Sequence, residues 1–231
     1  MKRSKPLEVV QELMERGLDR SLAQPVRREL RKARAEGILQ GLTATLRPGD
    51  VCIDCGAHIG DVALPLAATG AEVHAFEPEP RFFQKLADAS ADTPNLIVHQ
   101  AAVGIKNGEA RFFRSTAASK RPAKRATGGT LVAQSAVADE DSAVTVPVVD
   151  LAGYIEKLLH NHDRLAFMKI DVEGAEIDIV NHLVDTGVLP RIGLTVVETH
   201  RWLMKSRSAE FDRLNEIARK QPELNLFMGW I

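Results

Sequence analysis

The chain has 231 residues, of which 45% are hydrophobic and 26% charged, which suits one folded domain with a sizeable core and an extra segment. Its formal net charge of −1 gives no overall field that would attract a polyanion. The N-terminus lacks the apolar core of a signal peptide, and no apolar stretch approaches the roughly 20 residues that a bilayer requires. We therefore expect a cytoplasmic protein without a membrane span.

Two cysteines, Cys52 and Cys55, are spaced as a redox or metal-binding pair would be. They lie inside an apolar run that is typical of a strand, and no second ligand pair is nearby. We therefore favour two small buried side chains over a functional pair.

The apolar pattern of residues 1–45 predicts an N-terminal helical extension. Apolar residues recur at helical spacing in two stretches, Leu7–Leu18 and Val26–Ala33. Pro25 is expected in the first turn of the second helix and Gly37 at its end. The second stretch also carries a basic run, for which a solvated helix face is favoured over a nucleic-acid patch: Arg27, Arg28, Arg31, Lys32 and Arg34.

Strands and helices alternate through residues 46–231. The expected strands are Val51–Cys55, Ala71–Phe76, Leu96–His99, Ala166–Ile170, Gly193–Glu198 and Leu224–Trp230, and the expected helices are Asp61–Thr69, Arg81–Ala89, Ala175–Thr186 and Ser208–Lys220. This order predicts an α/β fold, a doubly wound and mostly parallel sheet with helices on both faces.

An insertion interrupts the alternation. Ala110–Phe113 and Val144–Val149 predict the strands of a hairpin, joined by the long polar segment 115–142. A loop of this length is either a functional lid or disordered, and both interpretations stay open. It contains a second group of basic residues: Lys120, Arg121, Lys124 and Arg125.

A glycine-rich turn follows the first strand of the predicted sheet, where doubly wound folds bind ligands. Gly56 would let the backbone turn sharply and approach a ligand, Gly60 would allow a close helix start, and Asp61 could cap that helix. The dinucleotide fingerprint needs three glycines, whereas Cys55 or Ala57 stands where another is required.

Acidic residues end the first two strands. Asp54 would repel a pyrophosphate but favours the ammonium and sulfonium groups of a methionine-derived ligand. Glu77, about twenty residues after the glycine turn, is placed to accept both hydrogen bonds of a ribose diol. That ribose contact is common to NAD and S-adenosylmethionine.

A third acidic stretch, residues 168–176, joins a strand to a helix. Asp171 could orient the ligand's amino group or act as a general base, or it could join Glu198 and His200 in a metal site. Glu173 and Glu176 also fit simple complementation of a helix dipole.

Four motifs in this order, D-x-G-A-x-x-G, F-E-P, K-I-D-V-E-G-A-E and E-T-H, resemble the FkbM-type methyltransferase family from about Gly49 to His200. The resemblance implies a Rossmann-like class I methyltransferase fold and methyl transfer from S-adenosyl-L-methionine to a hydroxyl of a sugar or natural product. No residue is assigned as a metal ligand. Sheets of this class commonly finish with an antiparallel pair. The chain stops at Ile231 with room for one last strand, so the sheet is abbreviated, completed by a partner, or truncated.

The resemblance also implies two sets of site residues. The cofactor-binding set is Asp54, Cys55, Gly56, His58, Ile59, Gly60, Glu77, Pro78, Gln100, Ala101 and Asp171. The catalytic set, which would face the transferring methyl without assigned roles, is Asp171, Glu173, Glu198 and His200.

Missing motifs favour an oxygen acceptor. The Asn-Pro-Pro-aromatic or Asp-Pro-Pro-aromatic tetrapeptide of base-amine methyltransferases is absent, and both cysteines lie in the first strand and its turn, where the nucleophile of cytosine-carbon methylation is not expected. Either His200 or Asp171 could remove the proton of the acceptor hydroxyl. We expect a small-molecule or saccharide acceptor, no nucleic acid, and a possible homodimer through the first helices. The alternatives are a nucleic-acid methyltransferase that uses the basic runs, an NAD-linked oxidoreductase, and a non-catalytic adenosyl-binding protein.

Overall fold

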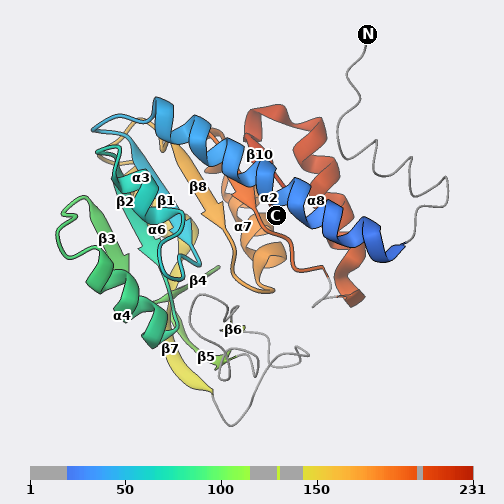
Figure 1. Cartoon of the computed structure of the whole chain (residues 1–231), viewed down its shortest axis with the longest axis horizontal. Helices are drawn as coiled ribbons and strands as arrows, with labels where there is room; N and C mark the ends of the chain where they lie inside the picture. Colours follow the sequence, from blue (N-terminus) through green and yellow to red (C-terminus); the bar gives the residue numbers. More distant parts are fainter. Residues whose placement is uncertain (1–19, 115–128, 131–142, 202–204, 231) are drawn as a thin grey trace.

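The computed structural model describes residues 20–114, 129–130, 143–201 and 205–230 (Figure 1). The first expected helix, Leu7–Leu18, and nearly all of the segment 115–142 lie outside the described residues, so the lid interpretation is not tested.

Six parallel strands form the main sheet, in the order β10-β9-β8-β1-β2-β3. They are β1 (Val51–Cys55), β2 (Glu72–Phe76), β3 (Leu96–His99), β8 (Phe167–Ile170), β9 (Thr195–Val197) and β10 (Leu226–Phe227). The chain runs outward from β1 through β2 to β3, and then returns to build the other half from β8. The reversal between β1 and β8 creates the crevice in which such sheets bind ligands, at the carboxyl ends of the strands. The predicted fold class is confirmed.

Helices cover both faces of this sheet, because alternate side chains of each strand enter different cores. Val51 and Ile53 of β1 pack with α6 (Leu151–Leu158), α7 (Glu176–Thr186) and α8 (Ser208–Lys220). Cys52 faces the opposite core, which is built with α2 (Arg20–Thr45), α3 (Ala63–Ala67) and α4 (Pro80–Ala89). Both cysteines are free and fully buried, as predicted.

A second, small sheet has the order β4-β7-β5-β6. β4 (Ala102–Gly104) leaves the end of β3 and pairs in parallel with β7 (Val144–Asp150). β5 (Gly108–Arg114) lies antiparallel between β7 and β6 (Gly129–Thr130). The expected hairpin therefore exists, and it lies at the end of the main sheet to which the strands point (Figure 1).

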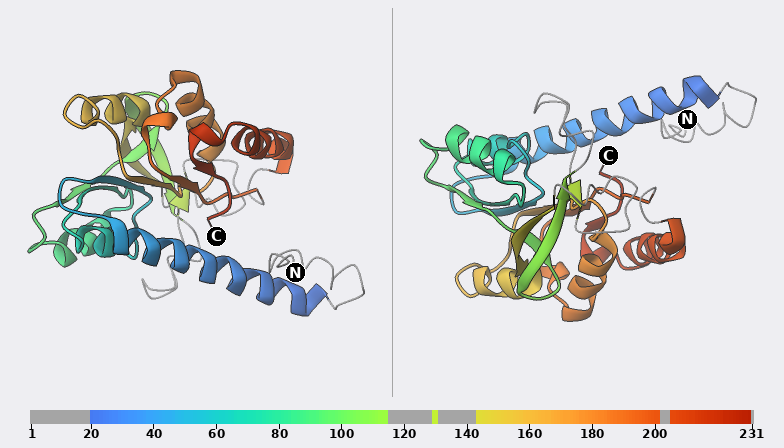
Figure 2. Two further views of the ribbon diagram at one scale, coloured as in Figure 1. Left: turned by 90° about the horizontal axis from the view of Figure 1, so that it is seen from above. Right: turned by 90° about the horizontal axis from the view of Figure 1, so that it is seen from below.

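The prediction for the second N-terminal helix is wrong at both ends. α2 is continuous from Arg20 to Thr45, so Pro25 is not in its first turn and Gly37 does not end it. Gly37 costs about 1 kcal/mol inside a helix. That cost is outweighed because Ile38, Leu39 and Leu42 beyond it pack on the core. The N-terminal end of α2 reaches past the rest of the described fold (Figure 2). None of the described helices is long and apolar enough to cross a membrane.

Other elements differ from the prediction in length. α3 begins after Val62 without any side-chain cap, so Asp61 does not cap it. The final strand is reduced to Leu226–Phe227, because Pro222–Leu224 forms a 3-10 turn and Asn225 takes a left-handed conformation with φ +50°. This last strand runs parallel to β9. Helix α6 was not predicted, whereas α8 has the bounds expected from the sequence.

Candidate active site

The glycine turn after β1 is shaped by contacts within the protein. Gly56 has φ +80°, and a Cβ there would lie 1.8 Å from the carbonyl oxygen of Asp171. Gly60 has φ +94°, and a Cβ there would lie 2.7 Å from Cδ1 of Leu86. Both positions therefore require glycine, Gly56 because the backbone after β8 packs directly on it.

Three successive amides of this turn already donate to protein acceptors. The N–H groups of Gly56 and Ala57 donate to the carbonyl of Phe76 at 2.9 and 3.0 Å, and that of His58 donates to Glu77 at 2.8 Å. A pyrophosphate site needs such amides for the anion. The turn therefore suits a ligand without phosphate better than a dinucleotide.

Glu77 ends β2 with its carboxylate turned into the glycine turn. It is 5% exposed, and its two oxygens accept hydrogen bonds from the amides of His58 and Glu79 at 2.8 and 2.9 Å. Burial outweighs these two bonds and raises the pKa of Glu77 to about 7. Each carboxylate oxygen has a second lone pair, so the group can also accept from a diol.

Lys169 joins the glycine turn to the third acidic stretch. Its buried ammonium lies 3.4 Å from Asp54 and 3.0 Å from Asp171, and it donates to the carbonyl of Gly56 at 3.2 Å. Burial lowers the pKa of Lys169, but the carboxylates of Asp171 and Asp54 outweigh burial and hold its pKa above the ordinary value. Burial raises the pKa of Asp54. The Lys169 ammonium therefore pairs with two carboxylates inside the protein, those of Asp54 and Asp171.

The loop after β8 turns sharply into α7. Glu173 and Gly174 have φ +55° and +116°. A left-handed Glu173 is uncommon and points to a functional constraint. The carboxylate of Glu176, fully buried in the first turn of α7, accepts the N–H of Gly174 at 3.0 Å and binds Nδ1 of His200 at 2.6 Å. Glu176 therefore fixes both the loop and the imidazole.

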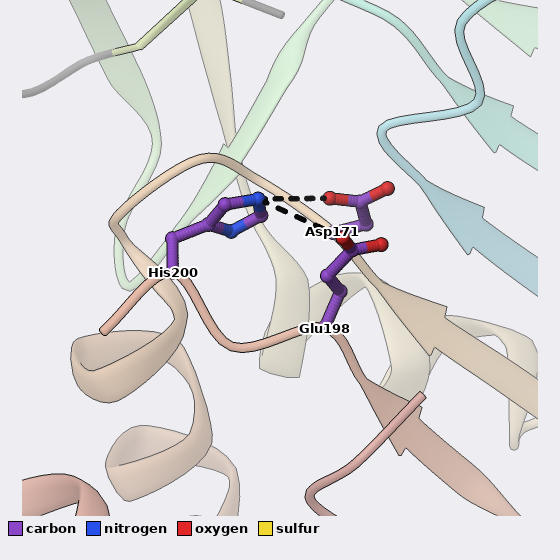
Figure 3. Close-up of side chains that lie close together, drawn as sticks. All are labelled: Asp171, Glu198 and His200. Carbon is purple, nitrogen blue, oxygen red and sulfur yellow. Dashed lines mark ion pairs between the residues drawn. The ribbon is translucent and has the colours of Figure 1, made fainter. Parts of the chain in front are cut away.

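Asp171, Glu198 and His200 form a carboxylate–histidine cluster at the carboxyl ends of β8 and β9 (Figure 3). One possible ligand atom from each lies within 4.8 Å of the others. Nε2 of His200 is 3.8 Å from Asp171 and 4.0 Å from Glu198, and Glu173 approaches the same nitrogen to 3.2 Å. The strands set this arrangement, because Asp171 donates its N–H to Cys55 and Glu198 donates its N–H to Ile170.

The electrostatics of this region follow from burial and close charges. Burial raises the pKa of Glu173 to about 7, and burial followed by the charge of Asp171 raises that of Glu198 to about 7. Burial alone would lower the pKa of His200, but the hydrogen bond to Glu176 and the surrounding carboxylates raise it to about 9. In this arrangement His200 carries a proton at neutral pH, so it is a poor general base, contrary to one of the two expectations from the sequence.

The four residues predicted to be catalytic thus lie close together. The residues predicted to bind the cofactor differ in how far their side chains are exposed to solvent. His58 packs its ring on Phe82 with centroids 4.0 Å apart, Pro78 and Ile59 are half-buried, and Gln100 is exposed. The side chains of Cys55 and Ala101 lie in the core. Only backbone atoms of Cys55 face the site, through the carbonyl that accepts from Asp171.

Sequence reasoning missed two residues of the site, Lys169 and Glu176. Lys169 carried a usable signal, since a lysine inside an otherwise apolar strand must find buried partners. Glu176 carried none, because an acid in the first turn of a helix is explained by the dipole alone.

Comparison with known proteins decides the family. Residues 54–221, more than half of the chain, match the methyltransferase FkbM domain. The chain belongs to this family. It carries an S-adenosylmethionine-dependent methyltransferase domain, and the sequence-based assignment of family and cofactor is confirmed.

Two relatives extend the comparison. The hexuronic acid methyltransferase AglP of Haloferax volcanii is 26% identical over 169 residues, which cover 71% of this chain and 62% of AglP. The 31-O-demethyl-FK506 methyltransferase FkbM of Streptomyces tacrolimicus is 32% identical over 177 residues, which cover 67% of each chain. The chain thus spans about two thirds of the length of these relatives or less.

Among solved structures, an rRNA methylase from Streptococcus thermophilus is 10% identical with a TM-score of 0.38, over 78% of this chain and 75% of that one. This likeness is too low to bear on the present chain, whose fold class rests on its own strand order.

Proposed function

We propose that the protein transfers a methyl group from S-adenosylmethionine to a hydroxyl oxygen of a saccharide or small natural product. The observation that carries this proposal is the convergence of Asp171, Glu198 and His200 within 4.8 Å, next to the glycine turn at the switch point of the sheet. A cofactor that extends from Glu77 along this turn ends beside the cluster, because the turn packs against the backbone of Asp171.

The two relatives support a hydroxyl acceptor of this class. One is named for a hexuronic acid and the other for an oxygen atom of FK506. Both names describe small or saccharide acceptors, and the near-neutral charge of the present chain agrees with such a substrate.

The residues present fit the chemistry that an oxygen acceptor requires. S-adenosylmethionine supplies an electrophilic methyl carbon on its sulfonium. Glu77 would hold the ribose diol, and the carboxylate–histidine cluster would bind the acceptor hydroxyl and take its proton. The Lys169 ammonium, which binds Asp171 and the Gly56 carbonyl, would keep the cluster at a fixed distance from the turn.

A nucleic-acid acceptor is less well supported. The basic run of α2 includes Arg34, which donates to the carbonyl of Gly229 and lies 4.9 Å over the ring of Phe227. That arginine therefore has a structural role in docking α2. A non-catalytic adenosyl-binding protein would have no use for the ordered cluster.

The function is tested by methyl transfer from S-[methyl-³H]adenosylmethionine to hexuronic acids, hexuronic-acid glycosides and hydroxyl-bearing macrolides, with tRNA and duplex DNA as comparison acceptors. We expect label in an oxygen-linked methyl group of at least one sugar or natural product. Label only in nucleic acid would contradict the proposal, and so would bound cofactor without transfer to any acceptor of the panel.

Binding of S-adenosylhomocysteine should depend on pH through Glu77. A ribose diol donates to the ionised carboxylate, so binding lowers the pKa of Glu77 below its free value of about 7. Below pH 7 the free protein must lose this proton to bind, and affinity should fall up to about tenfold per pH unit between pH 7 and 5.5. Calorimetry at several pH values measures this, with Glu77→Gln expected to bind weakly at every pH. A wild-type affinity that rises toward low pH would contradict the assignment.

A further inference from the structure

The imidazole of His200 lies between two groups of carboxylate oxygens. It is 6% exposed, and Nδ1–H donates to Glu176 at 2.6 Å. In the neutral ring this bond leaves the lone pair on Nε2, which faces carboxylate oxygens of Glu173 at 3.2 Å, Asp171 at 3.8 Å and Glu198 at 4.0 Å. Figure 3 shows the last two of these carboxylates. A lone pair facing carboxylate oxygens is repulsive. An electropositive species therefore belongs between Nε2 and these oxygens: a proton in the metal-free protein, or a metal cation that takes the place of this proton.

The spacing of the three groups fits a metal ion. Around an ion with bonds of about 2.1 Å, adjacent ligands are about 3.0 Å apart and opposite ligands about 4.2 Å apart. The separations of 3.8 and 4.0 Å from Nε2 lie between these limits. Asp171 and Glu198 follow neighbouring strands, so one ion could be shared between their side chains and His200.

The surroundings of the cluster also resemble those of a metal centre. Glu176 orients the imidazole through its other nitrogen, as buried carboxylates do for metal-binding histidines. Lys169 takes only Oδ2 of Asp171 and leaves Oδ1 directed at His200. One imidazole nitrogen with two carboxylates favours a first-row transition metal over Mg²⁺ or Ca²⁺, which prefer oxygen ligands alone.

We propose that Asp171, Glu198 and His200 bind one divalent transition-metal ion, of which Mn²⁺ is the test case. Three protein ligands leave coordination positions for oxygen atoms of the acceptor. The part that the metal plays in methyl transfer rests on the proposed function, whereas metal binding itself does not. Bound there, an acceptor hydroxyl loses its proton to a nearby carboxylate, its oxygen bonds to the methyl carbon, and the C–S bond breaks with its electron pair going to sulfur.

The experiment titrates Mn²⁺ into chelator-treated, full-length protein by calorimetry and records pulsed electron paramagnetic resonance of the complex. We expect one Mn²⁺ per chain, bound more tightly than Mg²⁺, with a ¹⁴N coupling from a directly bonded imidazole. Glu198→Gln should weaken Mn²⁺ binding at least tenfold. Two exposed residues of the same types serve as controls, and Glu156→Gln and His160→Gln should leave it unchanged.

Three results would overturn the metal site: no stoichiometric Mn²⁺ binding, bound Mn²⁺ without the ¹⁴N coupling, or equal binding by wild type and Glu198→Gln. The coupling is measured on the wild type, so the test does not depend on a variant that folds. S-adenosylhomocysteine titration and methyl transfer are followed in the same samples. Transfer that persists without Mn²⁺ binding refutes the metal site alone, whereas Mn²⁺ binding without transfer to any acceptor refutes only the proposed function.

Discussion

Replacing Gly56 with alanine is expected to lower the free energy of unfolding by at least about 2 kcal/mol and to weaken S-adenosylhomocysteine binding more than tenfold. The residue has φ +80°, and its new Cβ would lie 1.8 Å from the carbonyl oxygen of Asp171. A left-handed conformation alone costs an alanine about 1–2 kcal/mol, and the clash forces the two loops of the site apart. Chemical denaturation and calorimetric titration measure the two effects.

Gly187→Ala is the matched control for this prediction. Gly187 ends α7 with φ +72°, but a Cβ there would meet nothing within 4 Å, so only the backbone cost remains. Gly37→Ala, inside α2 with open space around it, should instead raise stability by about 0.5–1 kcal/mol. If Gly56→Ala were no more harmful than Gly187→Ala, the close packing of the two loops would not matter for the site.

Asp171→Asn is expected to lower kcat about 100-fold or more while changing S-adenosylhomocysteine affinity less than about threefold. The carboxylate belongs to the cluster that would handle the acceptor proton, and loss of a positioned acid or base typically costs 10²–10⁴-fold in rate. Asparagine keeps the shape and one acceptor oxygen for Lys169, which is 3.0 Å away, so the loop should keep its position. Single-turnover methyl transfer and calorimetry separate the two quantities.

Asp178→Asn provides the control, since this exposed acid of α7 pairs with Arg207 away from the cluster. Its kcat should remain at the wild-type value. An unchanged kcat in Asp171→Asn would remove Asp171 from the reaction. An equal loss of cofactor affinity and kcat would instead assign Asp171 to cofactor binding, which the sequence alone also allowed.

Much of the fold could be predicted because its strands follow a simple pattern. β1 and β8 are buried on both faces and therefore appear as short apolar runs, and α8 shows a clear helical spacing of Phe211, Leu214 and Ile217. The site edge was equally predictable, since Glu77, Asp171 and Glu198 all follow parallel strands whose ends meet.

The remaining features depend on tertiary contacts. The continuation of α2 beyond Gly37 results from packing of Leu39 and Leu42 on a sheet that lies far along the sequence. For Asp54 the sequence alone indicates only a contact with the ligand, because the spacing of residues 54 and 169 does not show that their side chains meet at 3.4 Å. The role of Glu176 depends on a histidine 24 residues away. Local propensity contains none of this information.

The most direct test of the adenosyl site is calorimetric titration of S-adenosylhomocysteine, with NAD beside it, into wild type and Glu77→Ala. Glu156→Ala, an exposed acid of α6, is the control. We predict micromolar binding of S-adenosylhomocysteine but not of NAD. This binding should be retained in Glu156→Ala and lost in Glu77→Ala. Wild-type affinity in Glu77→Ala, or preferential binding of NAD, would contradict an adenosyl site at the switch point between β1 and β8.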